Sequence, residues 1–400
     1  MAGAMTSYTL ALLPGDGIGR DVMLEAEKII SVVENNTPLS FQINKIPCGG
    51  KHYLETGEEW PEGSFEFCRD EADAILLGAI GWPGARTESG DLAGGSVILG
   101  LRSGLDLYAN VRPIRLYDGV NHKIHGNFQQ VWKPGMVDMV IIRENTEGLY
   151  HSLLRRCADA AQGRETWEPG EMDFPGLDGE VAWDPRPISR HGSERVIRYA
   201  FEIARRRNGA PVDGKTRVTC VDKSNVTRGC QLFNKIYHEI AEEYPDTETD
   251  HAYIDAFSMW LVRQPEWFDV VVTPNMFGDI STDLASVLQG GMGIAASANL
   301  GDSHGMFEPV HGSAPKYAGK NTTNPIAMIS SVSLMFDWLG TKNNDPTCTA
   351  ISDSIEQAVN QVLSGDKLTY DLGGSAGTSE VGDLVCQILE ENLRKHIPIA

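Results

Sequence analysis

Short apolar runs that end in glycines or polar clusters recur along the chain and predict buried strands. They are Tyr8 to Leu13, Ala74 to Leu77, Val137 to Ile142, Val218 to Val221 and Val270 to Thr273. The first run passes through Pro14-Gly-Asp-Gly-Ile-Gly19 into a segment whose apolar residues recur at helical spacing. A strand, a glycine turn and a helix in that order open an α/β fold. The other runs repeat the strand pattern, so we predict an α/β protein whose functional groups follow the strand ends.

Helical periodicity is clear in several later segments. Ser193 to Arg207 has an apolar stripe along one face, and Cys230 to Glu243 and Asp279 to Leu288 also predict helices. Ala327 to Leu339 is apolar almost all round, which predicts a helix buried in the core or at a subunit interface. Leu153 to Ser189 lacks sustained periodicity, so we expect a long irregular segment with a function or a subunit contact.

Length and charge limit the possible function classes. With 400 residues the chain is too long for one ordinary core, and about two domains are expected. Its 55 acidic residues exceed the 34 Lys and Arg, giving a formal net charge of -21, which disfavours nucleic-acid and membrane-surface binding. The seven cysteines contain no C-x-x-C pair, and the first apolar run is too short for a signal sequence. We therefore expect a cytoplasmic protein with reduced thiols.

The first glycine turn invites a dinucleotide-binding interpretation that its spacing does not support. Gly15-Asp-Gly-Ile-Gly19 has the pattern G-x-G-x-G, whereas the dinucleotide fingerprint is G-x-G-x-x-G. The acidic residue that ends the second strand of that fingerprint is also missing. A tight strand-to-helix turn is the favoured interpretation.

Three arginines lie at the ends of strands or loops, where they predict an anion pocket. They are Arg102, Arg112 and Arg143. A guanidinium at the end of an apolar strand needs a partner, and a carboxylate is its best match. For each arginine alone, pairing with an Asp or Glu of the protein is the commoner case. Together they suggest a pocket for a dicarboxylate or a tricarboxylate.

Two aspartates share one face of a predicted helix. Asp279 and Asp283 are spaced i, i+4, and like charges one turn apart repel unless a cation or a basic group lies between them. Their oxygens suit Mg²⁺ or Mn²⁺. Asp255 lies within an apolar stretch and also needs a partner. The alternative, with Asp279 as a helix N-cap and Asp283 solvated, has equal weight from spacing alone.

Further candidates come from a lysine, a tyrosine and a loop. Lys223 follows an apolar strand and is a candidate base, although a surface lysine is the commoner case. Tyr150 is a candidate acid, although a packed core tyrosine is the commoner case. The loop from His311 to Lys320 contains glycines, two lysines and no acidic residue, which suits a phosphate-rich ligand.

Six motifs in this order resemble those of the β-decarboxylating dehydrogenases, which include isocitrate, 3-isopropylmalate, homoisocitrate, tartrate and D-malate dehydrogenases. They are Leu13 to Gly19, Asp106 to Pro113, Arg143 to Tyr150, Asp222 to Asn225, Gly278 to Asp283 and Glu308 to Pro315. The resemblance runs from Leu12 to about Gly382. It implies an isocitrate/isopropylmalate dehydrogenase-like two-domain α/β fold, not a Rossmann fold. The active site would lie in the interdomain cleft at a dimer interface.

The resemblance also implies how the chain is divided. Residues 1–110 plus 290–400 would form a large, discontinuous cofactor-binding domain. Residues 111–289 would form a small domain with the dimer interface and the long insertion 153–189. Lys223 and Asp255 would reach the active site of the neighbouring subunit, so the family resemblance implies at least a homodimer.

Roles transfer residue by residue from the matching motifs. Arg102, Arg112 and Arg143 would bind the malate carboxylates of the substrate. Lys223 would be the base of the hydride step, and Tyr150 the acid that protonates the enol carbon. The metal ligands for Mg²⁺ or Mn²⁺ would be Asp279, Asp283 and the neighbour's Asp255. The cation would lower the pKa of the substrate hydroxyl and stabilise the enolate formed as CO₂ leaves.

The nicotinamide cofactor would lie against the loop after His311. By resemblance its contacts are His311, Gly312, Ser313, Ala314, Lys316, Tyr317, Asn324 and Tyr370. NAD-preferring members commonly have an acidic residue where this chain has Lys316-Tyr317, so these residues and Tyr370 favour NADP. NAD stays open, because Asp371 to Gly377 resembles isopropylmalate dehydrogenase and Gly374 replaces an arginine of one bacterial NADP-dependent type.

The substrate substituent would contact Ser96 and Ile98, which give mixed indications. Ser96 matches isocitrate dehydrogenases of the bacterial type, whereas Ile98 matches the apolar pocket of isopropylmalate dehydrogenases. Glu147 to Tyr150 resembles the isocitrate and tartrate enzymes. The expected reaction is NAD(P)-dependent and metal-dependent oxidative decarboxylation of a (2R)-hydroxy acid of the malate type. A specialised 2-alkylmalate or a phosphonate analogue is a further option for the substrate.

Two alternatives belong to other classes. One is a catalytically silent regulatory subunit of a hetero-oligomeric isocitrate dehydrogenase-like enzyme, against which the presence of all the candidate arginines and aspartates argues. The other is a metal-dependent lyase without a redox cofactor, against which the loop at His311 argues.

Overall fold

The computed structural model describes residues 6–88, 90–165, 170, 176 and 179–397. Twelve strands occur in these residues. They are β1 (Thr6–Leu13), β2 (Leu39–Lys45), β3 (Ala74–Leu77), β4 (Ala109–Arg115), β5 (His122–Ile124), β6 (Asn127–Gln129), β7 (Asp138–Glu144), β8 (Arg217–Asp222), β9 (Glu248–Tyr253), β10 (Val270–Thr273), β11 (Ala296–Leu300) and β12 (Gly305–Pro309).

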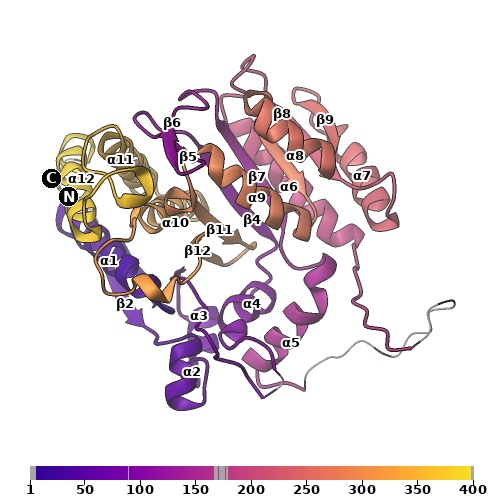
Figure 1. The fold of residues 1–400 in the computed structure, drawn as a ribbon, viewed down its shortest axis with the longest axis horizontal. Helices are drawn as coiled ribbons and strands as arrows, with labels where there is room; N and C mark the ends of the chain where they lie inside the picture. Colours follow the sequence, from indigo (N-terminus) through magenta and orange to yellow (C-terminus); the bar gives the residue numbers. More distant parts are fainter. Residues whose placement is uncertain (1–5, 89, 166–169, 171–175, 177–178, 398–400) are drawn as a thin grey trace.

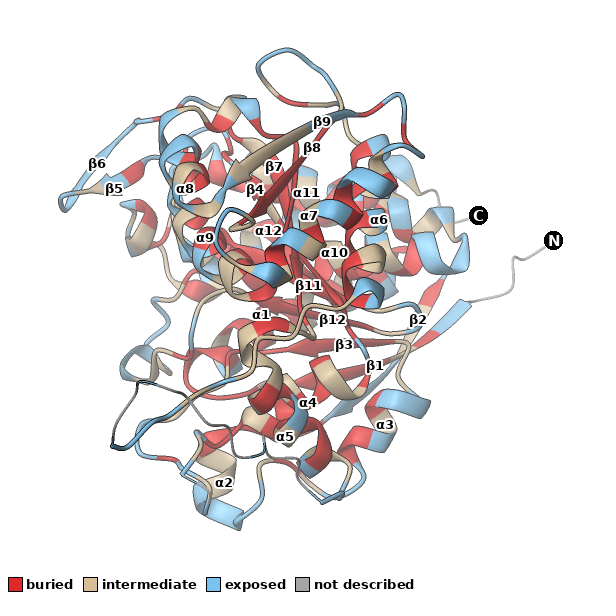
Figure 2. Ribbon diagram, turned by 90° about the vertical axis from the view of Figure 1, so that its right-hand side faces the viewer, coloured by how far each residue is buried: buried red, intermediate tan, exposed pale blue. Residues whose placement is uncertain are grey.

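The α-helices of the same residues surround the strands (Figure 1). They are α1 (Ile18–Asn36), α2 (Gly50–Thr56), α3 (Ser64–Asp70), α4 (Gly95–Gly104), α5 (His151–Ala161), α6 (Arg190–Arg206), α7 (Arg228–Ala241), α8 (Ile254–Arg263), α9 (Asn275–Leu288), α10 (Ile326–Asn343), α11 (Pro346–Leu363) and α12 (Thr378–His396). Figure 2 shows buried residues concentrated on the strands and on the helix faces turned toward them.

One mixed sheet runs through the molecule in the order β2-β1-β3-β12-β11-β4-β7-β10-β8-β9. Its first five strands come from the two ends of the sequence, and its last five come from the middle. The two groups join where β11 pairs antiparallel with β4. β4 also pairs antiparallel with β7, so chemistry-bearing residues of distant segments meet at the centre of the sheet.

Several elements agree with the sequence pattern. β3 and β10 have the predicted bounds, and the other predicted strands differ by at most two residues at either end. α10 packs on α1, α11, β11 and β12. Most of its residues are buried, so the prediction of a buried helix is confirmed.

The expectation of one irregular segment from Leu153 to Ser189 is wrong in its first part. α5 covers His151–Ala161 and packs along α4. Leu154, Cys157 and Ala158 are its buried apolar residues, a helical pattern too short to stand out in the sequence. The other end of the segment caps α6, because the Ser189 hydroxyl accepts a hydrogen bond from the Gly192 N–H at 3.0 Å. Residues 166–169, 171–175 and 177–178 of this segment lie outside the described residues.

The first glycine turn connects β1 to α1 and packs against the loop after β12. Gly17 has φ +54°, and a Cβ there would lie 2.0 Å from the Ser313 carbonyl oxygen, so no larger residue fits. Asp16 is buried in the same turn, and its carboxylate accepts hydrogen bonds from the backbone N–H groups of Gly50, Lys51 and Gly81 at 2.8–2.9 Å. The turn therefore holds three loops together.

Among the described residues, no helix combines the length and the apolar character that a membrane span needs.

Candidate active site

Three buried arginines converge at the centre of the sheet. Arg102 lies on α4, Arg112 on β4 and Arg143 on β7, one residue before the end of that strand. Burial lowers the pKa of Arg112 and of Arg143, and the positive charges of the neighbouring arginines lower both further. This mutual influence means that the three guanidinium groups lie near one another, as the sequence predicts.

Each arginine has a partner within the chain. Arg102 forms a buried ion pair with Glu308 at 2.5 Å. Arg143 donates from Nε and Nη2 to the Asn275 side-chain oxygen at 2.9 and 2.7 Å, and it forms an ion pair with Asp279. The arginines therefore pair with groups of the protein itself and also cluster, as an anion pocket requires.

Arg112 lies between the two aspartates of α9. Its guanidinium nitrogens are 3.8 Å from Asp279 and 3.7 Å from Asp283, and one of them donates to the Thr282 hydroxyl. The Nε atoms of Arg112 and Arg102 are buried and have no hydrogen-bond partner among the described residues. Buried donors without partners are costly, so these two atoms fit a ligand that brings acceptor oxygens.

Asp279 and Asp283 lie on one face of α9, one turn apart. The helix begins at Asn275, so Asp279 lies in its second turn and the N-cap alternative is wrong. Burial opposes ionisation of Asp279, but Arg143 and Arg112 outweigh it and hold the pKa of this carboxyl below its ordinary value. Burial raises the pKa of Asp283, whose side chain is 55% exposed. Both carboxylates can accept a ligand from the open side of the helix.

Tyr150 joins this group from the short turn before α5. Its hydroxyl donates a hydrogen bond to Asp279 Oδ2 at 3.1 Å. Burial, and next the negative charge of Asp279, raise the pKa of the Tyr150 phenol. The phenol therefore keeps its proton at neutral pH, which suits a proton donor.

Lys223 and Asp255 form a separate, exposed pair. Lys223 follows β8, Asp255 lies in the first turn of α8, and the two side chains form an ion pair. The bond from Lys223 lowers the pKa of Asp255. Among the described residues of one chain, no three His, Cys, Asp or Glu side chains gather as a metal site, so Asp255 does not join Asp279 and Asp283 within one chain.

Ser96 and Ile98 lie in the first turn of α4, ahead of Arg102 on the same helix. The Ser96 backbone N–H donates to the Glu59 carboxylate at 3.0 Å, and the Ser96 hydroxyl donates to the same carboxylate. Ile98 is partly buried against the apolar cluster beneath α4, as is Ile80.

The loop after β12 contains most of the predicted cofactor contacts. Gly312 is exposed, Ala314 adopts φ +34°, and the Ser313 carbonyl accepts a hydrogen bond from the Ile18 N–H at 2.8 Å. Lys316 is exposed, with its Nζ 4.9 Å from the centre of the Tyr317 ring. The loop is thus held at one end and open at the other.

The remaining predicted cofactor contacts surround Asp371. Asn324 donates to the Asp371 carboxylate at 3.1 Å. Burial lowers the pKa of His311, and its Nε2 has no partner among the described residues. Tyr370 is exposed, and the Lys123 ammonium lies 4.7 Å from the centre of its ring. A neutral imidazole with a free buried nitrogen fits a heterocyclic ligand.

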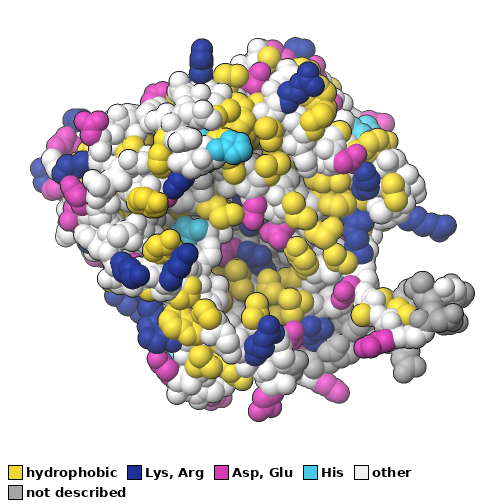
Figure 3. Space-filling model, viewed as in Figure 1, with side chains coloured by type: hydrophobic (Ala, Val, Ile, Leu, Met, Phe, Trp, Pro, Cys, Tyr) yellow, Lys and Arg dark blue, Asp and Glu magenta, His cyan; other side chains and the backbone are white. Residues whose placement is uncertain are grey.

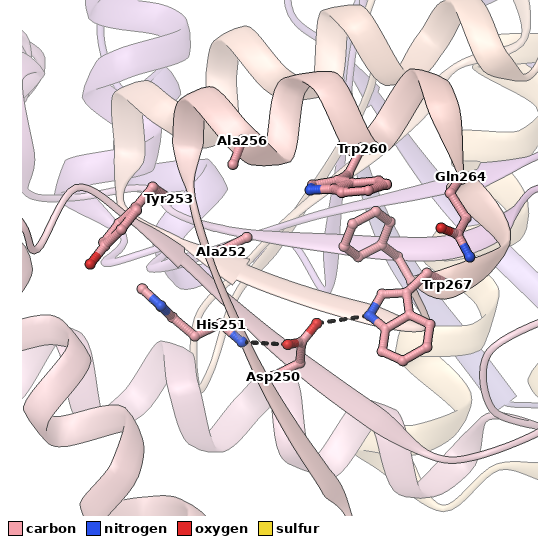
Figure 4. A pocket seen from close by; sticks show the side chains of 9 residues that line it. Asp250, His251, Ala252, Tyr253, Ala256, Trp260, Gln264 and Trp267 are labelled. Carbon is pink, nitrogen blue, oxygen red and sulfur yellow. Dashed lines mark hydrogen bonds between the residues drawn. The ribbon is translucent and has the colours of Figure 1, made fainter.

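The space-filling view shows a hollow near the centre of the molecule, between α9 and α4, with basic and acidic side chains at its edge (Figure 3). A second cavity of about 500 Å³ lies elsewhere, between the edge strand β9 and α8. Trp260 and Trp267 line it, and the Trp267 indole N–H donates to Asp250 at 2.8 Å (Figure 4). This second cavity contains none of the predicted site residues.

Four residues of the site were not predicted as site residues. Asn275 binds Arg143, Thr282 binds Arg112, Glu308 binds Arg102, and Glu59 binds Ser96. The first two belong to the polar segment after β10, and Glu308 belongs to a motif already noted, so the sequence contained a signal for them. Glu59 belongs to a loop with no motif, and only the fold brings it to α4.

The donor set fits the metal and the cofactor that the family resemblance implies. Asp279 is ionised, Asp283 is exposed, and both offer the hard oxygen ligands that Mg²⁺ and Mn²⁺ prefer. The exposed Lys316 and the neutral His311 fit the phosphate and the base of a nicotinamide dinucleotide.

Comparisons with known proteins agree with this arrangement. The family model described as isocitrate/isopropylmalate dehydrogenase matches residues 9–385. The chain is 37% identical to a 3-isopropylmalate/3-methylmalate dehydrogenase and 39% identical to a homoisocitrate dehydrogenase, both from Methanocaldococcus jannaschii. Each match covers 96% of this chain and 99% of the relative.

Solved structures give the same result. An isocitrate dehydrogenase from Methylococcus capsulatus is 34% identical, with a TM-score of 0.76 over 96% of this chain and 99% of that one. A β-decarboxylating dehydrogenase from Thermococcus kodakarensis in its apo form is also 34% identical, with a TM-score of 0.71 over 96% of both chains.

Proposed function

The chain belongs to the isocitrate/isopropylmalate dehydrogenase family and is a β-decarboxylating hydroxy-acid dehydrogenase, and on this premise we propose its reaction. It oxidatively decarboxylates a (2R)-hydroxy acid of the malate type, with NADP or NAD and with Mg²⁺ or Mn²⁺. One observation carries the proposal most directly: Arg102, Arg112 and Arg143 converge beside Asp279, Asp283 and the Tyr150 phenol.

The arginines bind the substrate through its carboxylates. Arg102 and Arg112 each keep a buried Nε without a partner among the described residues, and a substrate carboxylate supplies the missing acceptors. Arg143 is held by Asn275 and completes the positive lining of the pocket. Three fixed guanidinium groups orient a malate core before any bond changes.

Asp279 and Asp283, with Asp255 of the partner subunit, would hold the divalent cation. When bound, Mg²⁺ or Mn²⁺ supplies Lewis-acid stabilisation of negative charge on the substrate oxygen. The low pKa of Asp279 keeps this carboxylate ionised for that purpose over the neutral pH range.

Proton transfers are assigned to Lys223 and Tyr150. Lys223 of the partner subunit would accept the proton of the substrate hydroxyl, and a bound nicotinamide would supply the hydride acceptor for the carbon that bears this hydroxyl. Tyr150 donates its phenolic proton to the enol carbon after CO₂ has left. Its raised pKa keeps that proton in place until then.

The cofactor contacts are the loop from His311 to Tyr317 with Asn324 and Tyr370. An exposed Lys316 suits a ribose 2′-phosphate, which favours NADP over NAD. We assign residues 1–110 plus 290–400 to the domain that contains these contacts, and residues 111–289 to the second domain.

A homodimer completes the site. Lys223 and Asp255 lie on the same part of the molecule as an apolar strip on α8 and α9, which is formed by the exposed side chains of Met259, Val262, Ile280 and Val287. A second copy covering this strip would bring each Lys223–Asp255 pair toward the other chain's aspartates. A strip of this kind is typical of a subunit interface.

The reaction is tested by following reduction of the nicotinamide at its near-ultraviolet absorbance. The panel contains 3-isopropylmalate, 3-methylmalate, D-malate, tartrate, homoisocitrate and isocitrate, each with NAD or NADP and with Mg²⁺, Mn²⁺ or a chelator. We expect metal-dependent reduction and CO₂ release in equal amounts with at least one acid. Absence of reduction with every combination would contradict the proposal.

A further inference from the structure

Glu59 lies at the N-terminal end of the helix that contains Arg102. Its carboxylate accepts hydrogen bonds from the backbone N–H and the hydroxyl of Ser96 and from the backbone N–H of Gly94. Glu59 belongs to the loop between α2 and α3, thirty-seven residues before Ser96. A carboxylate of the protein itself therefore takes up the donors that this helix end would otherwise offer to an anion.

Two acidic side chains, Glu59 and Asp91, lie near this helix end, and Arg156 pairs with Asp91 at 3.5 Å. Burial raises the pKa of Glu59, three backbone N–H groups oppose that shift, and the negative charge of Asp91 raises the pKa further. The side chains nearby are apolar: Ile98 and Ile80 pack on the same cluster, and Ile80 closes over Gly94. The first turn of α4 thus combines a bound acid with an apolar surface.

We propose that Glu59 determines substrate specificity by excluding hydroxy acids with a third carboxylate and admitting malates whose substituent is hydrogen or alkyl. The inference rests on the proposed function, in which Ser96 and Ile98 contact the substituent. A third carboxylate would find the Ser96 hydroxyl already bonded to the Glu59 carboxylate at the same helix end, while the nearby Arg156 is paired with Asp91 at 3.5 Å. A methyl or isopropyl group would pack on Ile98 and leave the bonds to Glu59 intact.

The names of two relatives illustrate the distinction between alkyl substituents and substituents with a carboxylate. One is named for 3-isopropylmalate and 3-methylmalate, whose substituents are alkyl groups, and another for homoisocitrate, whose substituent has a third carboxylate. Their identities to this chain are similar, so overall similarity does not choose between the two classes. Glu59 makes the choice in favour of alkyl substituents.

The test is the ratio of kcat/KM for isocitrate to kcat/KM for 3-isopropylmalate, with D-malate as the reference because it has no substituent. In the wild-type enzyme we expect 3-isopropylmalate to be preferred by about 30-fold or more. Glu59→Gln removes the charge and offers an amide donor, so the ratio should rise by about 10-fold or more. Glu59→Ala, which removes the side chain, should shift the ratio in the same direction.

The matched control is Glu62→Gln, which removes the same charge from an exposed position of the same loop. This variant should leave the ratio unchanged. A wild-type preference for isocitrate, or an unchanged ratio in both Glu59 variants with normal D-malate oxidation, would overturn the inference about Glu59. Absence of oxidation with every acid of the panel described under the proposed function would instead contradict that function.

Discussion

The group around Asp279 and the pair of Lys223 with Asp255 contain similar charges in opposite environments. Asp279 is surrounded by buried arginines and by Tyr150, and its geometry is set by the centre of the sheet. Lys223 and Asp255 contact each other at the surface, on elements near the edge strand β9. One chain therefore brings together the arginines, aspartates and phenol that we propose as the substrate and metal site, while Lys223 and Asp255 bind each other apart from it. In the proposed dimer, each site would draw on the central group of one chain and on the Lys223–Asp255 pair of the other.

The largest expected effect comes from a change in the buried group around Asp279. Asp279→Asn removes a proposed metal ligand and the charge that balances Arg143, so metal-dependent turnover should fall by about 1,000-fold or more. The measurement is kcat across a Mn²⁺ titration. The control is Asp250→Asn, an aspartate beside the cavity of Figure 4, which should retain activity. Turnover within a few-fold of wild type in Asp279→Asn would remove this residue from the metal site.

A second prediction concerns how the free energy of unfolding depends on pH through Glu144, a buried residue at the end of β7. Burial raises the pKa of Glu144 from 4.5 to about 7. The folded state therefore binds this proton more tightly than the unfolded state, and the free energy of unfolding should decrease as pH rises from about 4.5 to 7. The decrease is on the order of 3 kcal/mol for this group.

Glu144→Gln should flatten that pH dependence, as measured by urea unfolding at several pH values and constant protein concentration. Asp255→Asn, in the exposed pair, should leave the pH dependence as in the wild type, because solvent screens an exposed ion pair. An equal slope in wild type and Glu144→Gln would show that Glu144 does not titrate in this range.

The smallest effect concerns Lys316, which is exposed, whereas Lys223 is partly buried, and which we propose to contact the cofactor. Lys316→Asp should shift the ratio of kcat/KM for NADP to that for NAD by about 10-fold or more toward NAD, because a 2′-phosphate loses a charged partner. Lys320→Asp, in the same loop, serves as the control. An unchanged ratio in Lys316→Asp would refute the role of Lys316 at the 2′-phosphate.

Sequence patterns predicted the buried group around Asp279 better than the residues that pair with it from distant parts of the chain. The i, i+4 spacing placed Asp279 and Asp283 on one face, and the strand end located Arg143 near them, whereas Arg112 lies in the middle of β4 and not at a strand end as expected. Local periodicity does not reveal partners far apart in sequence, so the bonds of Arg102 to Glu308 and of Ser96 to Glu59 emerge only from the fold. The short helix α5 was missed for a related reason, since three buried apolar residues give a weak pattern.

The sequence pattern also failed to predict much of the sheet. β3 and β10 are continuous apolar runs and were predicted with their observed bounds. β9 is an edge strand with polar and half-exposed residues, so it lacks the apolar run that predicted the others. The antiparallel pairing of β11 with β4, which joins the two halves of the sheet, depends on long-range packing rather than on local sequence.

The central claim is that Lys223 of one subunit completes the site built around Asp279 of the other. The most direct test mixes two inactive variants, Lys223→Met and Asp279→Asn, after unfolding and joint refolding. Random pairing puts about half of the chains into mixed dimers, each with one intact site, so we predict recovery of about one quarter of wild-type activity. Recovery near zero, with mixed dimers demonstrated by mass spectrometry and with wild-type protein regaining activity in the same procedure, would contradict the claim and place both residues in a site within one chain.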